Sequence, residues 1–201
     1  MGTRNLICVF LDGEYKVAQY SQFDGYPEGN GLDCLHFLNH LYDEKCPPEL
    51  YEMFRNLSWF TQEELDEIYG LLGVDESGWL TTDQSKRLRK YHPELSRDTG
   101  AAILPLIFKT NGNIKLVNNV DFAASDDCEW AWVIDFDKDT FEAYEGYNKW
   151  PLTPEDRFYS DHDKEKHRYY GVKLVKSWPL PGVGHLPSDE EFLAAFKRGD
   201  E

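Results

Sequence analysis

Residues 5–20 of the chain read NLICVFLDGEYKVAQY, and this stretch decides the fold prediction. Two runs rich in apolar and strand-forming residues, 5–11 and 14–20, are separated only by Asp12 and Gly13. An Asp-Gly pair between two such runs is a strong signal of a β-hairpin. We therefore predict that residues 5–20 fold into two strands joined by a tight turn.

A second hairpin is predicted in the other half of the chain, where Trp130–Phe136 and Thr140–Tyr144 flank the acidic turn 137–139. A further strand is predicted over Tyr169–Trp178, because the side chains alternate between two faces there. The second half of the chain is therefore rich in strands.

Helical patterns fill much of the sequence between the two hairpins. Leucines at helical spacing predict a helix over about 32–43, and sequences typical of helix starts at Thr61 and Thr81 fall in a helical block at about 47–110. Ser188 caps a last predicted helix. Hairpins separated by helices predict one α+β domain over 1–201, with an antiparallel sheet that carries helices on its faces.

The charge balance of the chain is strongly acidic. Its 201 residues include 21 Lys and Arg against 37 Asp and Glu, so the formal net charge is −16. Because duplex binding depends on neutralising phosphates with basic side chains, direct nucleic-acid binding is not expected. The hydrophobic fraction of 41% suffices for a packed core and argues against global disorder.

The cysteines and the N-terminal apolar run bear on the compartment. Cys8, Cys34, Cys46 and Cys128 lack the short paired spacings of zinc or redox motifs, so we predict reduced thiols in a cytoplasmic protein. The apolar run 6–11 is too short for a signal-peptide core or a membrane span, and no membrane association is expected.

Three stretches carry a resemblance to known proteins: GTRNLICVFLDGEYKVAQYSQFDGYPEGNG at 2–31, HPELSRDTG at 92–100 and CEWAWVIDFDKDTFEAYEG at 128–146. They resemble a family of uncharacterised proteins found in phages and some fungi. The family name implies no activity and no cofactor. A phage origin would imply a counter-defence role in the host cytoplasm, such as sequestering a host signal nucleotide.

The N-terminal region carries a weaker resemblance. Thr3-Arg4, the hairpin and Asp24 occur in an order found in bile-salt-hydrolase-like members of the Ntn (N-terminal nucleophile) hydrolases. This resemblance implies an Ntn-hydrolase-like fold. It also implies an amidohydrolase that uses Thr3 as nucleophile, with Asp24 nearby and the α-amino group of Thr3 as base. Such catalysis requires cleavage after Gly2, because removal of Met1 alone leaves Gly2 at the terminus.

A candidate anion site is centred on the glycine-rich stretch 23–31, ahead of the helix predicted at 32–43. Backbone N–H groups at a helix start can hold an anion, and an arginine fork suits phosphate or carboxylate. Aromatic rings near loops can stack on a planar ligand. The predicted ligand-binding residues are Arg4, Asp24, Gly25, Tyr26, Arg97, Asp98 and Trp132.

Each part of this predicted site also has a structural explanation. The glycines can serve a tight turn that needs positive φ. Arg97 can pair with Asp98 or Glu94, and Arg4 can pair with Asp24. Both explanations stay open at this point.

Metal sites have little support in the sequence. His36 and His40 share a helix face, but they lack the HExxH pattern. The acidic turn 135–139 resembles the start of a calcium loop, yet Thr140 and Gly146 stand where glycine and glutamate are needed. We predict neither a metal nor a cofactor.

Three functions follow from these observations. The leading hypothesis is a non-catalytic module that binds a small anionic, nucleotide-like ligand, and the first alternative is the Ntn-type amidohydrolase. The second alternative is an acidic surface that binds a host protein or imitates nucleic acid. It rests on nine acids, which can equally serve solubility: Asp121, Asp126, Asp127, Glu129, Asp135, Asp137, Asp139, Glu142 and Glu145.

Overall fold

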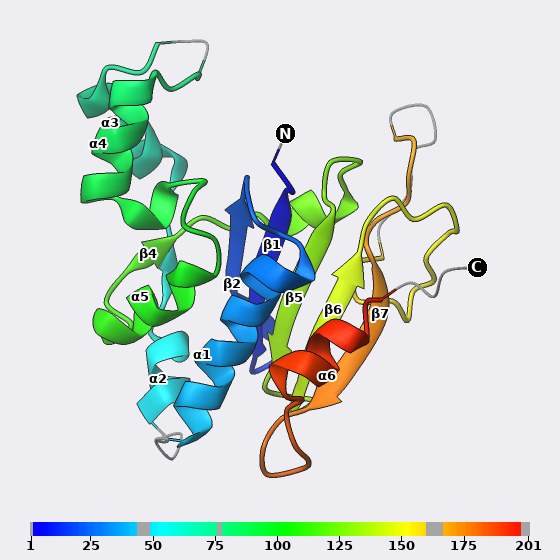
Figure 1. Ribbon diagram of the computed structural model, residues 1–201. Helices are drawn as coiled ribbons and strands as arrows, with labels where there is room; N and C mark the ends of the chain where they lie inside the picture. Colours follow the sequence, from blue (N-terminus) through cyan, green and yellow to red (C-terminus); the bar gives the residue numbers. More distant parts are fainter. Residues whose placement is uncertain (1, 44–48, 76–77, 160–166, 198–201) are drawn as a thin grey trace.

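A five-stranded sheet forms the centre of the computed structural model, which describes residues 2–43, 49–75, 78–159 and 167–197 (Figure 1). The strand order is β2-β1-β5-β6-β7. The five strands are β1 (Asn5–Leu11), β2 (Glu14–Ser21), β5 (Trp130–Asp135), β6 (Thr140–Glu145) and β7 (Lys173–Pro179). A separate parallel ladder joins β3 (Ser58–Trp59) to β4 (Lys115–Leu116).

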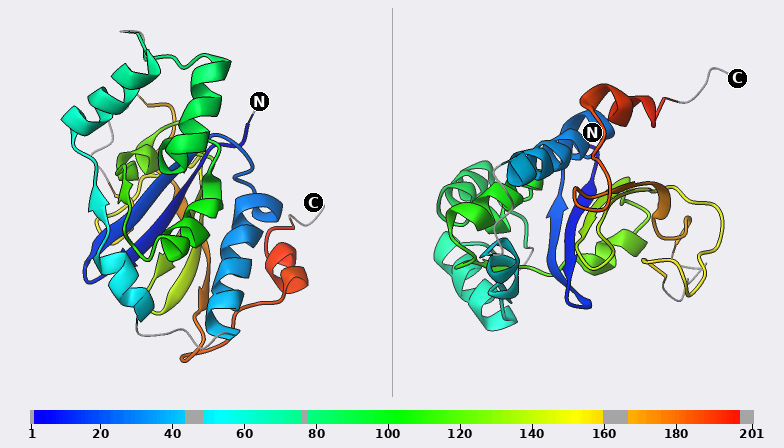
Figure 2. Two further views of the ribbon diagram at one scale, coloured as in Figure 1. Left: turned by 90° about the vertical axis from the view of Figure 1, so that its left-hand side faces the viewer. Right: turned by 90° about the horizontal axis from the view of Figure 1, so that it is seen from below.

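The helices lie on one face of the sheet and beside its β2 edge (Figures 1 and 2). They are α1 (Leu32–Asp43), α2 (Glu49–Arg55), α3 (Gln62–Leu72), α4 (Thr82–Tyr91), α5 (Ile103–Lys109) and α6 (Asp189–Ala194), with short 3-10 turns at Pro93–Leu95, Gly100–Ala102 and Val120–Ala124. Capping boxes open α3, α4 and α6 at Thr61, Thr81 and Ser188. Over the described residues, no helix is long and apolar enough to cross a membrane.

The sheet is mixed, because β1 and β5 run parallel while the other neighbouring pairs are antiparallel. The prediction of an α+β protein is confirmed, and the prediction of an antiparallel sheet is corrected at this one pair. Parallel neighbours need a long crossover connection. The chain between β2 and β5 supplies it and carries five of the helices named above.

The two predicted hairpins both form, and their turns are tied together. Asp12 and Gly13 take positive φ values of 56° and 79°, as a tight hairpin turn requires. Their backbone N–H groups donate to the carboxylate of Asp137 in the β5–β6 turn, at 2.8 and 2.7 Å. Asp137 therefore fixes the parallel pair β1–β5 at one end.

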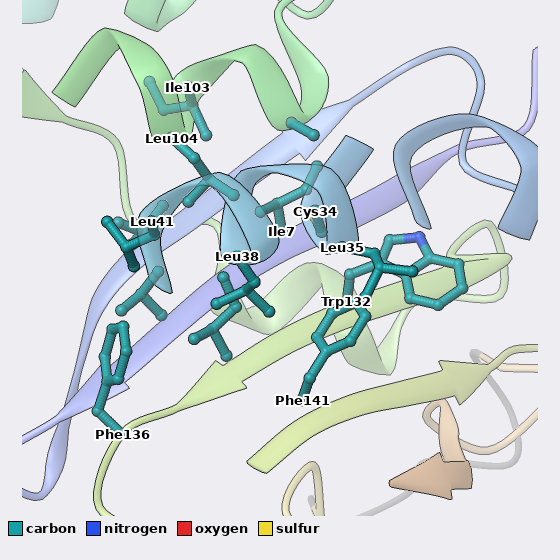
Figure 3. Close-up of a cluster of buried hydrophobic side chains, with 14 of the residues drawn as sticks. Ile7, Cys34, Leu35, Leu38, Leu41, Ile103, Leu104, Trp132, Phe136 and Phe141 are labelled. Carbon is teal, nitrogen blue, oxygen red and sulfur yellow. The ribbon is translucent and has the colours of Figure 1, made fainter. Parts of the chain in front are cut away.

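One face of the sheet packs against α1, α5 and α6. Leu35, Leu38 and Leu41 of α1 are buried there, together with Trp132 of β5 and Phe141 of β6 (Figure 3). The helical spacing of the three leucines predicted a helix over about 32–43, and this prediction is confirmed. Burial of these apolar side chains is the main force that holds the helices on the sheet.

The opposite face packs against the 3-10 turn Val120–Ala124 and against Phe158 and Val172 from the chain between β6 and β7, where Arg157 serves as an anchor. The Arg157 side chain is 7% exposed, and its guanidinium pairs with the buried carboxylates of Asp135 and Glu142. Its Nε also donates to the hydroxyl of Tyr144 at 3.1 Å. Two buried acids thus share one cation, and the loop that carries Arg157 is locked onto the sheet.

Two element boundaries differ from the sequence prediction. The last strand begins at Lys173 rather than at Tyr169, because a β-bridge between Tyr170 and Asn148 holds the preceding residues away from the ladder. The helical block at 47–110 is interrupted by the short strand β3, which β4 recruits through backbone pairing. Neither pairing has a local sequence signal.

Replacing Arg157 by Met should lower the free energy of unfolding by about 3–5 kcal/mol, because two buried carboxylates lose their cation. Urea denaturation measures this change. The triple variant Arg157→Met, Asp135→Asn, Glu142→Gln should regain much of the loss, and Arg168→Met, at an exposed arginine, should change stability by less than about 0.5 kcal/mol. A small loss in the single variant would contradict the anchoring role.

Candidate functional site

A cavity of about 270 Å³ lies between the outer edge of β2, helices α3 and α4, and the turn 93–98. Its apolar wall is formed by Leu80, Leu88, Leu95 and Val117. Its polar groups include Tyr20, Ser85, Ser96, Arg97 and Asn119. The cavity therefore combines an apolar lining with several polar side chains, as small-molecule sites do.

Two backbone hydrogen bonds cover the edge of β2 on either side of this cavity. The N–H of Asn119 donates to the carbonyl of Ala18 at 3.1 Å, and the N–H of Gln22 donates to the carbonyl of Arg97 at 2.8 Å. Outward and inward backbone groups alternate along an antiparallel strand, so the N–H of Tyr20 points to the same side. The cavity thus occupies a gap at the sheet edge.

The turn that carries Arg97 is held by its own side chains. The N–H of Asp98 donates to Oγ of Ser96 at 3.3 Å, and the carboxylate of Glu94 lies 3.1 Å from Nδ1 of His92. Glu94 therefore serves His92, and the side chains of Arg97 and Asp98 remain exposed. Both of these predicted ligand residues line the cavity.

Basic side chains gather beside the cavity, on α4 and the following turn. Lys86, Arg87, Arg89 and Lys90 are exposed on α4, and Arg97 is exposed at the cavity. Within the described ranges, none of these five side chains forms an ion pair. The four α4 cations lie outside the lining of the cavity, which holds Arg97 together with the acids Glu94 and Asp98.

Arg4, the other arginine of the predicted ligand site, forms an ion pair with a different residue. Its guanidinium is 2.7 Å from Asp127, so it does not form the expected pair with Asp24. Partial burial raises the pKa of Tyr20, and the charges of Arg4 and Arg97 both act to lower it. The two arginines are thus within electrostatic reach of one hydroxyl, although Arg4 does not line the cavity.

The glycine-rich stretch 23–31 uses its backbone amides internally. The N–H of Gly25 donates to the carbonyl of Thr3 at 3.0 Å, and the N–H of Asn30 donates to the carbonyl of Asp24 at 2.7 Å. The N–H groups of Gly29 and Gly31 both point to the carbonyl of Tyr26. These amides are not free to hold an anion. The alternative explanation, a turn that needs positive φ, is wrong as well, because Gly25, Gly29 and Gly31 do not take positive φ. These glycines instead permit close packing, since an added Cβ would meet a neighbouring atom at 2.6, 2.2 and 2.7 Å, respectively.

The aromatic residues of the predicted site lie in different environments. Trp132 is 0% exposed, and its Nε1 donates to the carbonyl of Gly25 at 2.9 Å. A ring without exposed surface cannot stack on a ligand, so Trp132 has no place in a binding site here. Tyr26 is exposed, and its hydroxyl donates to the Asp24 carboxylate at 3.3 Å, away from the cavity residues.

Thr3 and Asp24, the residues of the hydrolase alternative, lie near each other because Gly25 bonds to Thr3. Asp24 is exposed, with a positive φ of 56°. Neither residue lines the cavity described above. The hydrolase alternative depends on a free amino group at Thr3 and stays a prediction.

Most of the nine acids of the acidic-surface alternative have structural partners. Asp135 and Glu142 are buried against Arg157, and Asp137 caps the first hairpin turn. Asp127 forms an ion pair with Arg4, and Glu129 accepts a hydrogen bond from the backbone N–H of Arg4. Asp126 accepts hydrogen bonds from the backbone N–H groups of Arg168 and Tyr169. The run of acids in the sequence is therefore not a continuous exposed face.

Metal and thiol chemistry find no support in the described geometry. Nε2 of His36 lies 3.0 Å from the Asp189 carboxylate on α6, and the residues described contain no group of three or more potential metal ligands. Burial raises the pKa of Cys8, Cys34 and Cys128, which keeps these thiols protonated. Cys46 lies outside the described residues.

The chain was compared with models of protein families, with curated proteins and with solved structures, and none of the three comparisons gives a match. The resemblances to the phage and fungal family and to the Ntn hydrolases therefore stay predictions.

Sequence reasoning missed most of the cavity, because its lining comes from separate parts of the chain: Tyr69 from α3, Ser85 and Leu88 from α4, and Asn119 from the segment after β4. One signal was available. Four cations fall within 86–90 of a strongly acidic chain, and they mark the helix that borders the cavity.

Gly31→Ala should lower the free energy of unfolding by about 1–3 kcal/mol, since a Cβ there would lie 2.7 Å from the buried ring of Trp132. Gly70→Ala is the matched control. Gly70 is an exposed helical residue with open space around it, so this change should stabilise the protein by about 0.5–1 kcal/mol. Thermal unfolding of both variants measures the difference, and a neutral Gly31→Ala would refute the packing role.

Proposed function

We propose that the protein is a non-catalytic module that binds a small anionic, nucleotide-like ligand in the cavity at the β2 edge. The observation that carries this proposal is the position of Arg97. Its guanidinium is exposed at the cavity and has no ion pair among the residues described. An unpaired arginine fork suits phosphate or carboxylate.

The size and lining of the cavity support a ligand of this class. A volume of about 270 Å³ suits a small molecule rather than a polymer. Leu88, Leu95 and Val117 offer apolar contact to a flat ring system, while Ser85 and Asn119 offer hydrogen bonds to its edge. In this arrangement, the ring system enters between α4 and β2, and the anionic group stays at Arg97.

A module of this kind acts by holding its ligand. None of the described cysteines lines the cavity, because all of them are buried elsewhere. The carboxylate of Glu94, a possible general base in the lining, lies within hydrogen-bond distance of His92. Sequestration of a signal nucleotide, the role implied by the phage resemblance, is one use of such binding.

Arg97→Gln should weaken ligand binding by about tenfold or more, because charge-assisted hydrogen bonds contribute about 1.5–3 kcal/mol. Thermal-shift measurements with a panel of mononucleotides and cyclic nucleotides identify a ligand, and calorimetry with that ligand gives the affinity. Arg168→Gln removes the same charge from an exposed site outside the cavity and should leave binding unchanged. If no nucleotide shifts the unfolding temperature of the wild-type protein, the proposal fails.

Ser85→Tyr should abolish binding by filling the cavity, since Ser85 projects from α4 into its lining. Thr82→Tyr, an exposed position on the same helix, should bind like the wild type. Circular dichroism verifies that both variants fold. Full affinity in Ser85→Tyr would show that the ligand binds elsewhere.

A further inference from the structure

The two edges of the sheet differ in how they are protected. The edge of β2 is covered by hydrogen bonds from Asn119 and Gln22 to neighbouring backbone. β7 ends the sheet on the other side, and no backbone hydrogen bond reaches its outer edge from the described part of the chain. Residues 173–177 of β7 are all exposed.

Large apolar side chains gather at the start of this open strand. Trp150 is 72% exposed, and Tyr147, Leu174 and Val175 are each close to half exposed. These four residues line a hollow of about 440 Å³ between the chain that leaves β6 and the beginning of β7. Contiguous exposed apolar groups of this kind mark interaction sites in soluble proteins.

The charges around the hollow select the kind of partner. Lys149 and Lys173 are exposed in its lining, and Lys176 is exposed further along β7. Glu145, across from Lys173 on β6, is the acid in the hollow's lining. Pairing β7 with a second copy would bring two lysine-bearing edges together, and their like charges repel. Charge complementarity therefore favours an acidic partner over a second copy.

We infer that the outer edge of β7 accepts an extended acidic segment of a partner protein as an additional strand. The segment would take up the free backbone groups of β7, as in other cases of strand addition. Its apolar side chains would fill the hollow beside Trp150 and Leu174, and its carboxylates would lie near Lys173 and Lys176. This surface is on the opposite edge of the sheet from the β2 cavity and does not depend on the function proposed for it.

Fluorescence anisotropy with two labelled peptides tests the inference. One peptide alternates Glu with Val, and the other alternates Lys with Val. The Glu–Val peptide should bind saturably, with an affinity that falls as salt rises, and the Lys–Val peptide should bind at least about tenfold more weakly. A Glu–Val peptide that is N-methylated along one edge should lose binding, because strand addition needs its N–H groups.

Charge-reversal variants complete the test. The double variant Lys173→Glu, Lys176→Glu should invert the preference, so that the Lys–Val peptide binds better. Lys86→Glu, Lys90→Glu is the matched control, because it makes the same change of net charge on exposed α4 and should keep the wild-type preference.

Four results would overturn the inference. The first is that neither peptide binds saturably to the folded wild-type protein, and the second is that both peptides bind equally well. The third is that the α4 control shows the same inversion of preference. The fourth is that the wild type sediments as a dimer that Val175→Asp dissociates. The last result would show that a second copy occupies the edge.

Discussion

The buried indole of Trp132 holds together three parts of the chain that are far apart in sequence. Its Nε1 donates to Gly25 in the loop after the first hairpin, its ring stacks on Trp130 at 5.4 Å, and Phe192 of α6 packs against it. A buried indole N–H needs an acceptor, and only the carbonyl of a closely packed loop supplies it here. The absence of a side chain at Gly31 gives this ring its space. The loop is therefore part of the core.

That arrangement explains why the glycine-rich loop looks like an anion site in the sequence without being one in space. Glycines permit close approach of backbone to another group, and sequence alone does not say whether that group is a phosphate or a ring. The loop amides bond to Thr3, Asp24 and Tyr26, whereas Arg97 lines the cavity at the β2 edge.

The sequence predicted what depends on neighbours along the chain. The Asp12-Gly13 turn, the capping boxes and the leucine spacing of α1 each have a local physical signal, and each appears in the structure. The parallel pairing of β1 with β5 has no such signal, because it depends on where a long crossover returns. The cavity was hidden for the same reason: Tyr20, Ser85 and Arg97 meet only through tertiary packing. The acids around 121–145 show that neighbours in the sequence can be separated in space, because several of them belong to buried pairs and a turn cap.

The parallel pairing of β1 with β5 also has a consequence for synthesis of the chain. Asn5 pairs with Trp130, and their separation is 125 residues, so contacts of this kind form late and slowly. The first hairpin leaves the ribosome long before its inner neighbour has been made. Throughout that interval, the inner side of β1, which is later the most deeply buried strand, has only β2 beside it. This edge stays unpaired until translation has passed the second hairpin, and an unpaired strand edge can pair with other chains, so elongation is the interval in which the chain is most exposed to aggregation.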